Sequence, residues 1–162
     1  MLMYDVYPQR QIAQWACWFT SLEMLTKFYR ENGAGDNLIP PSEDWYCCDI
    51  YNKNKGIGGA DFLQREYIAT KLGYKVQYGT LSIDDFIEKL SNEPFIYAGQ
   101  WPNRGTGHWL VVRGIDDKNL YYCDPATGHY ETQDFYYFMT LYLKQSIYRP
   151  IVYTDNIVNP YY

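Results

Sequence analysis

Apolar side chains near the start of the chain return at every third or fourth position, the spacing of a helix with a buried face. The pattern follows Gln14, and the ENGAG segment at residues 31–35 supplies two glycines that stop a helix. The recurring side chains are Trp15, Trp18, Phe19, Leu22, Leu25, Phe28 and Tyr29. This pattern predicts a helix over about residues 14–30, preceded by a short extended segment at residues 2–8.

Two further helices are predicted before the middle of the chain. Ser42 is placed to cap a short helix that reaches about Tyr51. Residues 60–72 show a longer helical pattern, and Gly73 follows it as a C-terminal stop. The region at residues 31–59 otherwise matches no familiar pattern, and we expect it to contribute to substrate preference.

From residue 74 the pattern changes to the alternation that is typical of half-buried strands. Residues 82–90 are an exception, because Ser82 and the acids after it predict a short helix. Residues 132–143 fit a helix or a strand, and we favour the helix. Pro150 places the last strand at a sheet edge or a bulge, because proline cannot donate to a sheet. The predicted strands are residues 74–79, 94–99, 107–116, 120–124 and 146–154.

The order of these elements, helices first and then a mostly antiparallel sheet, predicts an α+β fold. The chain has 162 residues, which suits a single domain over residues 1–162. Its composition, with 47% hydrophobic and 20% charged residues, is that of a globular protein with a substantial core.

Charge and hydropathy narrow the class of partner. The net charge is −5 and no run is rich in lysine or arginine, so nucleic acid is not expected as a partner, because phosphate contacts need clustered positive charge. No stretch of about 18 apolar residues exists, so no membrane span is predicted. The N-terminal sequence MLMYDVYPQRQ has neither the basic nor the apolar part of a signal peptide. We expect cytoplasmic synthesis, and export by a route without such a signal stays open.

The cysteines do not suggest disulfides or a metal. Cys17, Cys47, Cys48 and Cys123 are few and irregularly spaced, unlike a disulfide framework. The adjacent pair at 47 and 48 lacks the Cys-x-x-Cys spacing and the nearby histidines of a zinc site. Cys47, Cys48 and Cys123 are therefore interpreted as buried thiols, and no cofactor or metal is expected.

Tyrosine is the most unusual part of the composition, with 19 residues. A tyrosine ring contributes to a core, but its hydroxyl needs a hydrogen-bond partner or water. Six tyrosines in the second half of the chain form either an exposed aromatic surface or core positions with hydroxyls at the surface, and we favour the core. These residues are Tyr121, Tyr122, Tyr136, Tyr137, Tyr161 and Tyr162.

Cys17 stands out among the cysteines because it lies where the first helix begins. A cysteine between two tryptophans is most often a small core residue. The first turn of a helix, however, presents unpaired N–H groups and the positive end of the helix dipole, and both stabilise a thiolate. Cys17 is therefore a candidate nucleophile, provided that a base lies beside it.

The chain has two histidines, and one of them is well placed to be that base. His108 opens the strand HWLVVRGID, and Asp124 ends the next predicted strand. The start of one strand and the end of its antiparallel neighbour meet at the same sheet edge. A carboxylate there would fix the imidazole tautomer and leave the other ring nitrogen for a thiol. His129 is the rival base, but we expect it in a loop without a carboxylate partner.

Acyl transfer also needs donors for the oxyanion of a tetrahedral intermediate. The backbone N–H of Cys17 is one candidate, and a glutamine side chain just upstream is the second. Gln11 lies six positions before the cysteine (17 − 11 = 6), and Gln14 lies three before it (17 − 14 = 3). The residues alone leave both glutamines open.

Gln-x5-Cys-Trp, a His-Trp pair opening a strand, and Asp-Pro sixteen residues after the histidine (124 − 108 = 16) together resemble the papain-like cysteine peptidases. The closest likeness is to compact bacterial groups, the C39-like peptidases, related to bacteriocin-leader-processing enzymes, and the AvrRpt2-like C70 group. The resemblance covers roughly residues 9–130 and implies a papain-like fold. It also implies that Cys17 is the nucleophile, His108 the base, Asp124 the orienting acid and Gln11 the oxyanion glutamine.

Some features depart from plant and lysosomal papains. Their Cys-Gly-Ser-Cys-Trp signature is absent, and this chain has Gln-Trp-Ala-Cys-Trp instead. His108 follows Cys17 by 91 residues (108 − 17 = 91), closer than the roughly 130–150 residues of those enzymes. The third member is Asp124 rather than an asparagine. These departures favour the shorter bacterial groups.

The sequence thus predicts a cysteine peptidase that cleaves a peptide or protein substrate through an acyl-thioester on Cys17. Two alternatives stay open. One is another acyl-transfer enzyme on the same residues, such as a deamidase, transglutaminase-like enzyme or amidase, acting as an effector or toxin. The other is a non-catalytic binding module, which the complete set of Cys17, His108, Asp124 and Gln11 disfavours.

Overall fold

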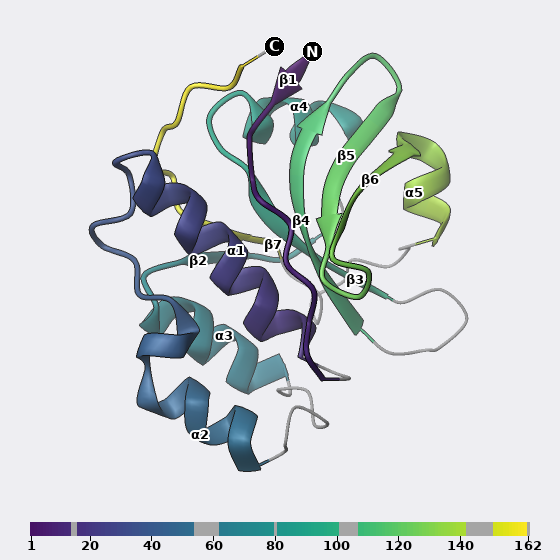
Figure 1. Cartoon of the computed structure of the whole chain (residues 1–162). Helices are drawn as coiled ribbons and strands as arrows, with labels where there is room; N and C mark the ends of the chain where they lie inside the picture. Colours follow the sequence, from purple (N-terminus) through teal and green to yellow (C-terminus); the bar gives the residue numbers. More distant parts are fainter. Residues whose placement is uncertain (14–15, 54–61, 80, 101–106, 142–150, 162) are drawn as a thin grey trace.

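The computed structural model describes residues 1–13, 16–53, 62–79, 81–100, 107–141 and 151–161. Its helices are α1 (Cys17–Glu31), α2 (Trp45–Lys53), α3 (Phe62–Lys71), α4 (Ile83–Leu90) and α5 (Phe135–Leu141), with a 3-10 helix at Pro41–Glu43. Its strands are β1 (Leu2–Met3), β2 (Lys75–Gln77), β3 (Phe95–Gln100), β4 (Gly107–Ile115), β5 (Asn119–Asp124), β6 (His129–Asp134) and β7 (Ile151–Tyr153). The helices α1, α2 and α3 lie together beside a twisted sheet (Figure 1).

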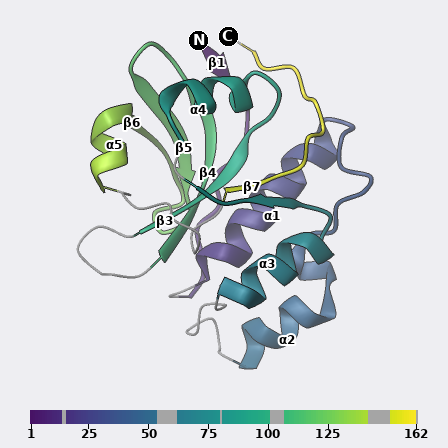
Figure 2. The same ribbon diagram turned by 180° about the vertical axis from the view of Figure 1, so that it is seen from behind.

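The sheet is antiparallel at every described pairing, in the order β2-β7-β3-β4-β5-β6, and β1 pairs with the end of β4. Helix α1 packs against β3 and β4 on one face of this sheet. Helix α4 lies over the opposite face, as the view from behind shows (Figure 2). The predicted α+β architecture, with N-terminal helices on an antiparallel sheet, is confirmed.

Helix α1 is the centre of the core. Its apolar side chains are spaced as the sequence predicted, and Leu22, Leu25 and Tyr29 have no exposed surface. Polar residues on the helix are buried as well, and the Thr26 hydroxyl is hydrogen-bonded to the Tyr74 hydroxyl at 2.6 Å. Most residues of α1 are therefore buried, and those at its N-terminal end, Cys17 and Trp18, are among them.

The cap predicted for the second helix is wrong. Ser42 lies within the 3-10 helix, and α2 begins after Asp44, whose carboxylate accepts a hydrogen bond from the Cys47 N–H at 3.0 Å. The other carboxylate oxygen of Asp44 contacts the Lys71 ammonium on α3 at 2.8 Å. Burial opposes the charge of Asp44, but the hydrogen bonds from Lys71 and Cys47 outweigh it and lower the pKa of that carboxyl. Asp44 therefore caps α2 and ties it to α3.

The cap predicted for α4 is confirmed in detail. The Ser82 hydroxyl accepts from the Asp85 N–H at 3.2 Å, and the Asp85 carboxylate accepts from the Ser82 N–H at 2.8 Å. This reciprocal pair is a capping box, which satisfies two backbone donors at a helix start. Helix α3 also ends as predicted, with Gly73 just after it at a φ of +100°.

Two predictions about the end of the sheet need correction. The first part of the segment predicted as helix, up to Asp134, belongs to strand β6, and only Phe135–Leu141 is helical. The last strand does not lie at a sheet edge, because β7 pairs with β2 on one side and β3 on the other. The alternative, a bulge at Pro150, stays untested because Pro150 lies outside the described residues.

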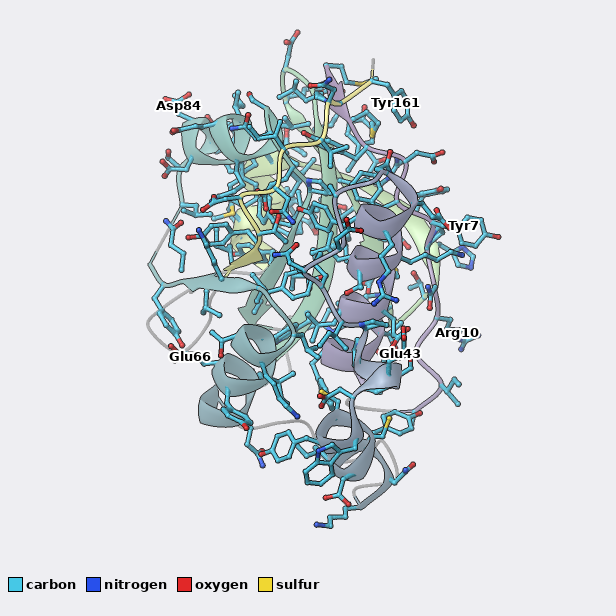
Figure 3. All side chains as sticks on the ribbon, turned by 90° about the vertical axis from the view of Figure 1, so that its left-hand side faces the viewer. Tyr7, Arg10, Glu43, Glu66, Asp84 and Tyr161 are labelled. Carbon is cyan, nitrogen blue, oxygen red and sulfur yellow. The ribbon has the colours of Figure 1, made fainter. Side chains whose placement is uncertain are left out.

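The tyrosines divide between the core and the surface. Tyr122 is buried, but Tyr136, Tyr137 and Tyr161 are about half exposed or more, at 64%, 54% and 49%. The favoured prediction of core positions is therefore wrong for these three, and Tyr162 lies outside the described residues. Figure 3 shows Tyr161 near one end of the molecule, with Tyr7 and Arg10 following along the N-terminal segment beside α1.

Candidate active site

Cys17 is the first residue of α1, and Ala16 before it provides no side-chain cap. The helix therefore leaves the first amides, including that of Cys17, without intrahelical partners. The positive end of the helix dipole lies at the same place. The Cys17 side chain is largely enclosed, with 8% of the residue exposed. This is the helix-terminal environment that the sequence predicted for the thiol.

His108 and Asp124 lie on neighbouring strands and contact each other directly. Val111 of β4 faces Cys123 of β5, and continuing this register brings the end of β5 close to the start of β4. The His108 Nε2 atom is 2.7 Å from Asp124 Oδ1, and the two residues are 3% and 6% exposed. A carboxylate only accepts hydrogen bonds, so Nε2 carries the proton and Nδ1 is left to face another group.

The thiol of Cys17 lies near this imidazole, because a hydrogen bond and a charge interaction with Cys17 are among the causes that raise the pKa of His108. Burial disfavours a charged ring and lowers the pKa of His108, but the hydrogen bonds to Asp124 and Cys17 and their charges outweigh burial, so that the pKa is raised overall. The structure therefore brings Cys17, His108 and Asp124 into one chain of contacts, with the imidazole in the middle.

A tight turn between β5 and β6, residues 124–128, holds the carboxylate of Asp124. The N–H of Ala126 donates to Asp124 Oδ1 at 2.9 Å, the same oxygen that meets the imidazole. The N–H groups of Thr127 and Gly128 donate to the Asp124 carbonyl at 3.2 and 2.8 Å. Asp124 is thus both a turn residue and the partner of His108.

Gln11 lies beside this turn. Its backbone N–H donates to the Pro125 carbonyl at 2.7 Å. Its side-chain Nε2 donates to the Ala13 carbonyl at 3.2 Å, and that carbonyl also accepts from the Ala16 N–H at 3.2 Å. The side-chain amide is therefore held at the Ala13 carbonyl, a few residues before α1. One hydrogen of Nε2 is used in this contact, and an amide nitrogen carries a second one.

The two rivals of these residues fare differently. Gln14, the other candidate oxyanion donor, lies outside the described residues. His129 does not lie in a loop as predicted, because it begins β6 and faces Asp124 across the strand pair. Its side chain is exposed, whereas the imidazole on the Asp124 carboxylate is that of His108. The structure therefore favours His108 over His129 as the histidine of the site.

The other cysteines lie elsewhere, and all four are free thiols. Cys47 and Cys123 are buried as predicted, and burial is the main cause that raises the pKa of both, to about 12 for Cys123. Cys48 is only half-buried, so its prediction as a buried thiol is not met. Its sulfur lies 3.5 Å from the carbonyl oxygens of Pro41 and Ser42.

The contact between the Gln11 segment and the turn at 124–128 was missed at the sequence level. The signal for it was present in the Asp-Pro-x-x-Gly pattern, which ends in Gly128. That glycine has a φ of +72° and lies against Arg10, so its place in the motif has a structural reason.

The model of a protein family described as "papain-like cysteine protease AvrRpt2" matches residues 2–142. The chain belongs to this family. The match includes Cys17, His108, Asp124 and Gln11, and it agrees with the resemblance that these residues suggested. The chain is accordingly a papain-like cysteine protease by family. No curated protein sequence matches it.

Solved structures resemble the fold of this papain-like protease closely at low sequence identity. One is the peptidase domain of Streptococcus ComA, described as a bifunctional ABC transporter involved in a quorum-sensing pathway, with a TM-score of 0.64, 19% identity, and coverage of 93% of this chain and 99% of that one. Another is a protein from Bacillus anthracis described as a C39-like peptidase, with a TM-score of 0.65, 16% identity, and coverage of 97% and 98%. The fold is thus that of the compact C39-like peptidases. Among the residues described, none of the helices has the length and apolar character needed to span a bilayer.

Proposed function

We propose that this protein hydrolyses peptide bonds through an acyl-thioester on Cys17, with His108 as the base and Asp124 as its orienting carboxylate. The observation that carries the proposal is the chain of contacts from thiol to imidazole to carboxylate at the start of α1. Its occurrence in a chain of the papain-like family supports the same assignment. The substrate class is a peptide or protein.

In the first step, Nδ1 of His108 takes the thiol proton and the Cys17 sulfur forms a bond to the carbonyl carbon of the substrate. The carbonyl π electrons move to oxygen and give a tetrahedral oxyanion. When this intermediate collapses, the carbon–oxygen double bond forms again and the carbon–nitrogen bond breaks. The proton on Nδ1 passes to the leaving amine, and an acyl-thioester remains on Cys17.

In the second step, water attacks the thioester carbon and gives its proton to His108. The carbon–oxygen double bond then forms again and the carbon–sulfur bond breaks, which releases a carboxylic acid, and the proton on His108 returns to the Cys17 sulfur. Asp124 stays bound to Nε2 throughout, so that the ring keeps the orientation and tautomer in which Nδ1 faces the sulfur. The hydrogen bond of Ala126 to the same carboxylate oxygen supports this role, because it limits rotation of the carboxylate.

The oxyanion is assigned to two donors on the same segment of chain. The first is the Cys17 amide, which lies in the first turn of α1 and has no intrahelical acceptor. The second is the Nε2 group of Gln11, which is held by its hydrogen bond to the Ala13 carbonyl and has one further hydrogen for a ligand. Both donors are fixed before substrate arrives, which is the condition under which such groups lower a barrier most.

A peptide library of mixed sequence, analysed by mass spectrometry, tests the proposal. We expect cleaved products with new amine and acid ends, and an acylated Cys17 when the reaction is quenched with acid. Cys17→Ala should give neither, whereas Cys48→Ala, a change at the half-exposed thiol, should give both. If glutamine side chains are converted to glutamate and no peptide bond is cleaved, the protein is a deamidase rather than a peptidase. Absence of both products and of any adduct on Cys17 would leave a binding module.

A further inference from the structure

The turn at residues 124–128 and the segment before α1 approach more closely than side chains normally allow. A Cβ atom added at Gly128 would lie 2.6 Å from the Cβ of Arg10, and 3.1 Å from both its Cα and its backbone nitrogen. The φ of Gly128, +72°, is also one that other residues adopt only with strain. Glycine at this position therefore serves two purposes. It allows the backbone conformation of the turn, and it leaves room for Arg10 to pack directly against it.

The next residue of the same segment is bound to the same turn. The Gln11 N–H donates to the Pro125 carbonyl at 2.7 Å. Two adjacent residues, Arg10 and Gln11, are thus held against the turn by one close backbone contact and one hydrogen bond. In Figure 1 the N-terminal segment runs down beside α1 and passes the β5–β6 turn just before α1 begins, and Figure 3 places Arg10 on this stretch.

The same turn also holds the carboxylate of Asp124. The Ala126 N–H binds the Asp124 side chain, and the Gly128 N–H binds its carbonyl at 2.8 Å. One short piece of backbone therefore fixes both the partner of His108 and the seat of Gln11. Its contacts with Arg10 and Gln11 connect it to the segment before α1.

We propose that Gly128 is a positioning residue of the oxyanion site. Because it has no side chain, Arg10 packs directly against the turn, and this contact determines where the side-chain amide of the next residue, Gln11, lies. This role rests on the proposed function, in which Gln11 stabilises the oxyanion. A methyl group at Gly128 forces the backbone of Arg10 away, since the atoms it meets are backbone atoms and the first atom of the side chain. A displacement of about 1 Å in a group that aids catalysis can cost about 10²-fold in rate.

The test compares Gly128→Ala with Gly33→Ala. Gly33 has nearly the same φ, +71°, but nothing lies within 4 Å of the position that its Cβ would take. Both variants carry the same backbone strain, and only the first meets Arg10. Three quantities are measured for each variant. They are the hydrogen-exchange protection of the Gln11 backbone N–H, the alkylation rate of Cys17 by iodoacetamide, and the turnover of the peptide from the library that is cleaved fastest.

We expect Gly128→Ala to lower Gln11 protection by at least about tenfold and kcat by about 10- to 100-fold. KM and the Cys17 alkylation rate should stay within about twofold, because a group that acts on the oxyanion does not alter substrate binding or the thiolate. Gly33→Ala should match the parent protein in all three measurements. If Gly128→Ala is too unstable to study, Arg10→Gly/Gly128→Ala removes the 2.6 Å contact, leaves only the two at 3.1 Å, and should recover most of the protection of the Gln11 backbone N–H and most of kcat.

Three results would overturn the role. One is parental kcat and parental Gln11 protection in Gly128→Ala. Another is a fall in kcat matched by slower Cys17 alkylation, which would show that the variant acts through Asp124 and His108 instead. A third is no recovery in the double variant. The exchange measurement needs no substrate, so it tests the contact between Gly128 and Arg10 even if the parent protein cleaves no peptide. A parent protein that cleaves no peptide would count against the proposed function alone.

Discussion

One oxygen of Asp124 meets two donors, the Nε2 group of His108 at 2.7 Å and the Ala126 N–H at 2.9 Å. The backbone donor limits rotation of the carboxylate, and the carboxylate in turn fixes the imidazole. Both residues of the pair are almost fully enclosed, at 3% and 6% exposure, so water does not compete for the contact. The direction of the ring toward Cys17 is therefore set by a turn sixteen residues further along the chain (124 − 108 = 16).

The first prediction concerns the pKa of His108, which Asp124 and Cys17 raise above its ordinary value. Asp124→Asn should lower this pKa, because the carboxylate supplies a hydrogen bond and a charge. Cys17→Ala should lower it as well, for the same two reasons. Both shifts can be followed by NMR titration of the ring signals, with the exposed ring of His129 as an internal reference.

The same pKa has a consequence for folding. A raised histidine pKa stabilises the folded state fully below the unfolded value of about 6.5, and this contribution is lost as pH rises through the folded pKa. Asp124→Asn should therefore reduce the free energy of unfolding more near pH 6 than near pH 9. Denaturant titrations at both pH values measure the difference. An equal loss at both would mean that the pair acts only as a neutral hydrogen bond.

The second prediction is that Cys17 reacts fastest with iodoacetamide near pH 6, although the residue is only 8% exposed. Its thiol lies beside the imidazole of His108, which can take the thiol proton as the sulfur reacts. Burial raises the pKa of Cys47 and Cys123 and should keep both slow. Peptide mapping by mass spectrometry gives the rate at each cysteine.

Cys48 is the sharpest comparison for this experiment, because it is more exposed than Cys17 but has no imidazole partner among the described residues. If exposure governed the rate, Cys48 would be labelled first, and the assignment of Cys17 as nucleophile would fail. His108→Ala should slow Cys17 by about tenfold or more while leaving Cys48 unchanged.

The parts of the fold that were predicted from sequence are those with local causes. The periodicity of α1 and the Ser82 capping box of α4 depend on residues within a few positions of each other. Strand β6 was missed because its residues, HYETQD, are mostly exposed and carry little apolar alternation. Its place comes from pairing with β5, a contact between segments that sequence patterns do not describe.

The candidate site divides in the same way. Cys17, His108 and Asp124 were predicted from the order of residue types and the expected meeting of two strand ends, and in the structure His108 contacts Asp124 and lies near Cys17. The hydrogen bond from the Gln11 N–H to the Pro125 carbonyl was not predicted. A backbone group of almost any residue can make such a bond, so the sequence gives no sign of it. Only Gly128, whose φ and lack of space demand glycine, left a trace in the sequence.

The third prediction concerns Glu93, a buried acid that the sequence did not single out. It is 1% exposed and accepts from the Thr154 N–H at 2.7 Å and from the Tyr29 hydroxyl at 3.1 Å. Burial raises the pKa of Glu93, and the hydrogen bonds and the charge of Lys89 offset only part of this rise. The folded state therefore binds the proton more tightly than the unfolded chain does.

Because the folded-state pKa of Glu93 is raised, its contribution to stability is greatest below the pKa of glutamate in the unfolded chain, about 4.3. This contribution is lost as pH rises through the pKa in the folded state. Glu93→Gln keeps an acceptor for Thr154 and removes the titration. Its free energy of unfolding, relative to the parent, should rise between pH 5 and pH 8. Glu88→Gln, an exposed change on α4, should show no such trend. A relative stability of Glu93→Gln that falls with pH would reverse the assigned direction.

The last prediction separates Gln11 from Cys17 by the kind of loss each causes. Gln11 does no proton transfer or covalent chemistry in the proposed mechanism, and its amide only stabilises charge that develops in the transition state. Gln11→Ala should therefore lower kcat by about 10²–10³-fold, with KM and the alkylation of Cys17 little changed. Cys17→Ala should abolish the acyl-enzyme altogether. Gln14→Ala is the matched control and should have a smaller effect on kcat, measured on the same peptide. A loss in Gln14→Ala with parental turnover in Gln11→Ala would move the oxyanion role to Gln14 and leave the role of Cys17 intact.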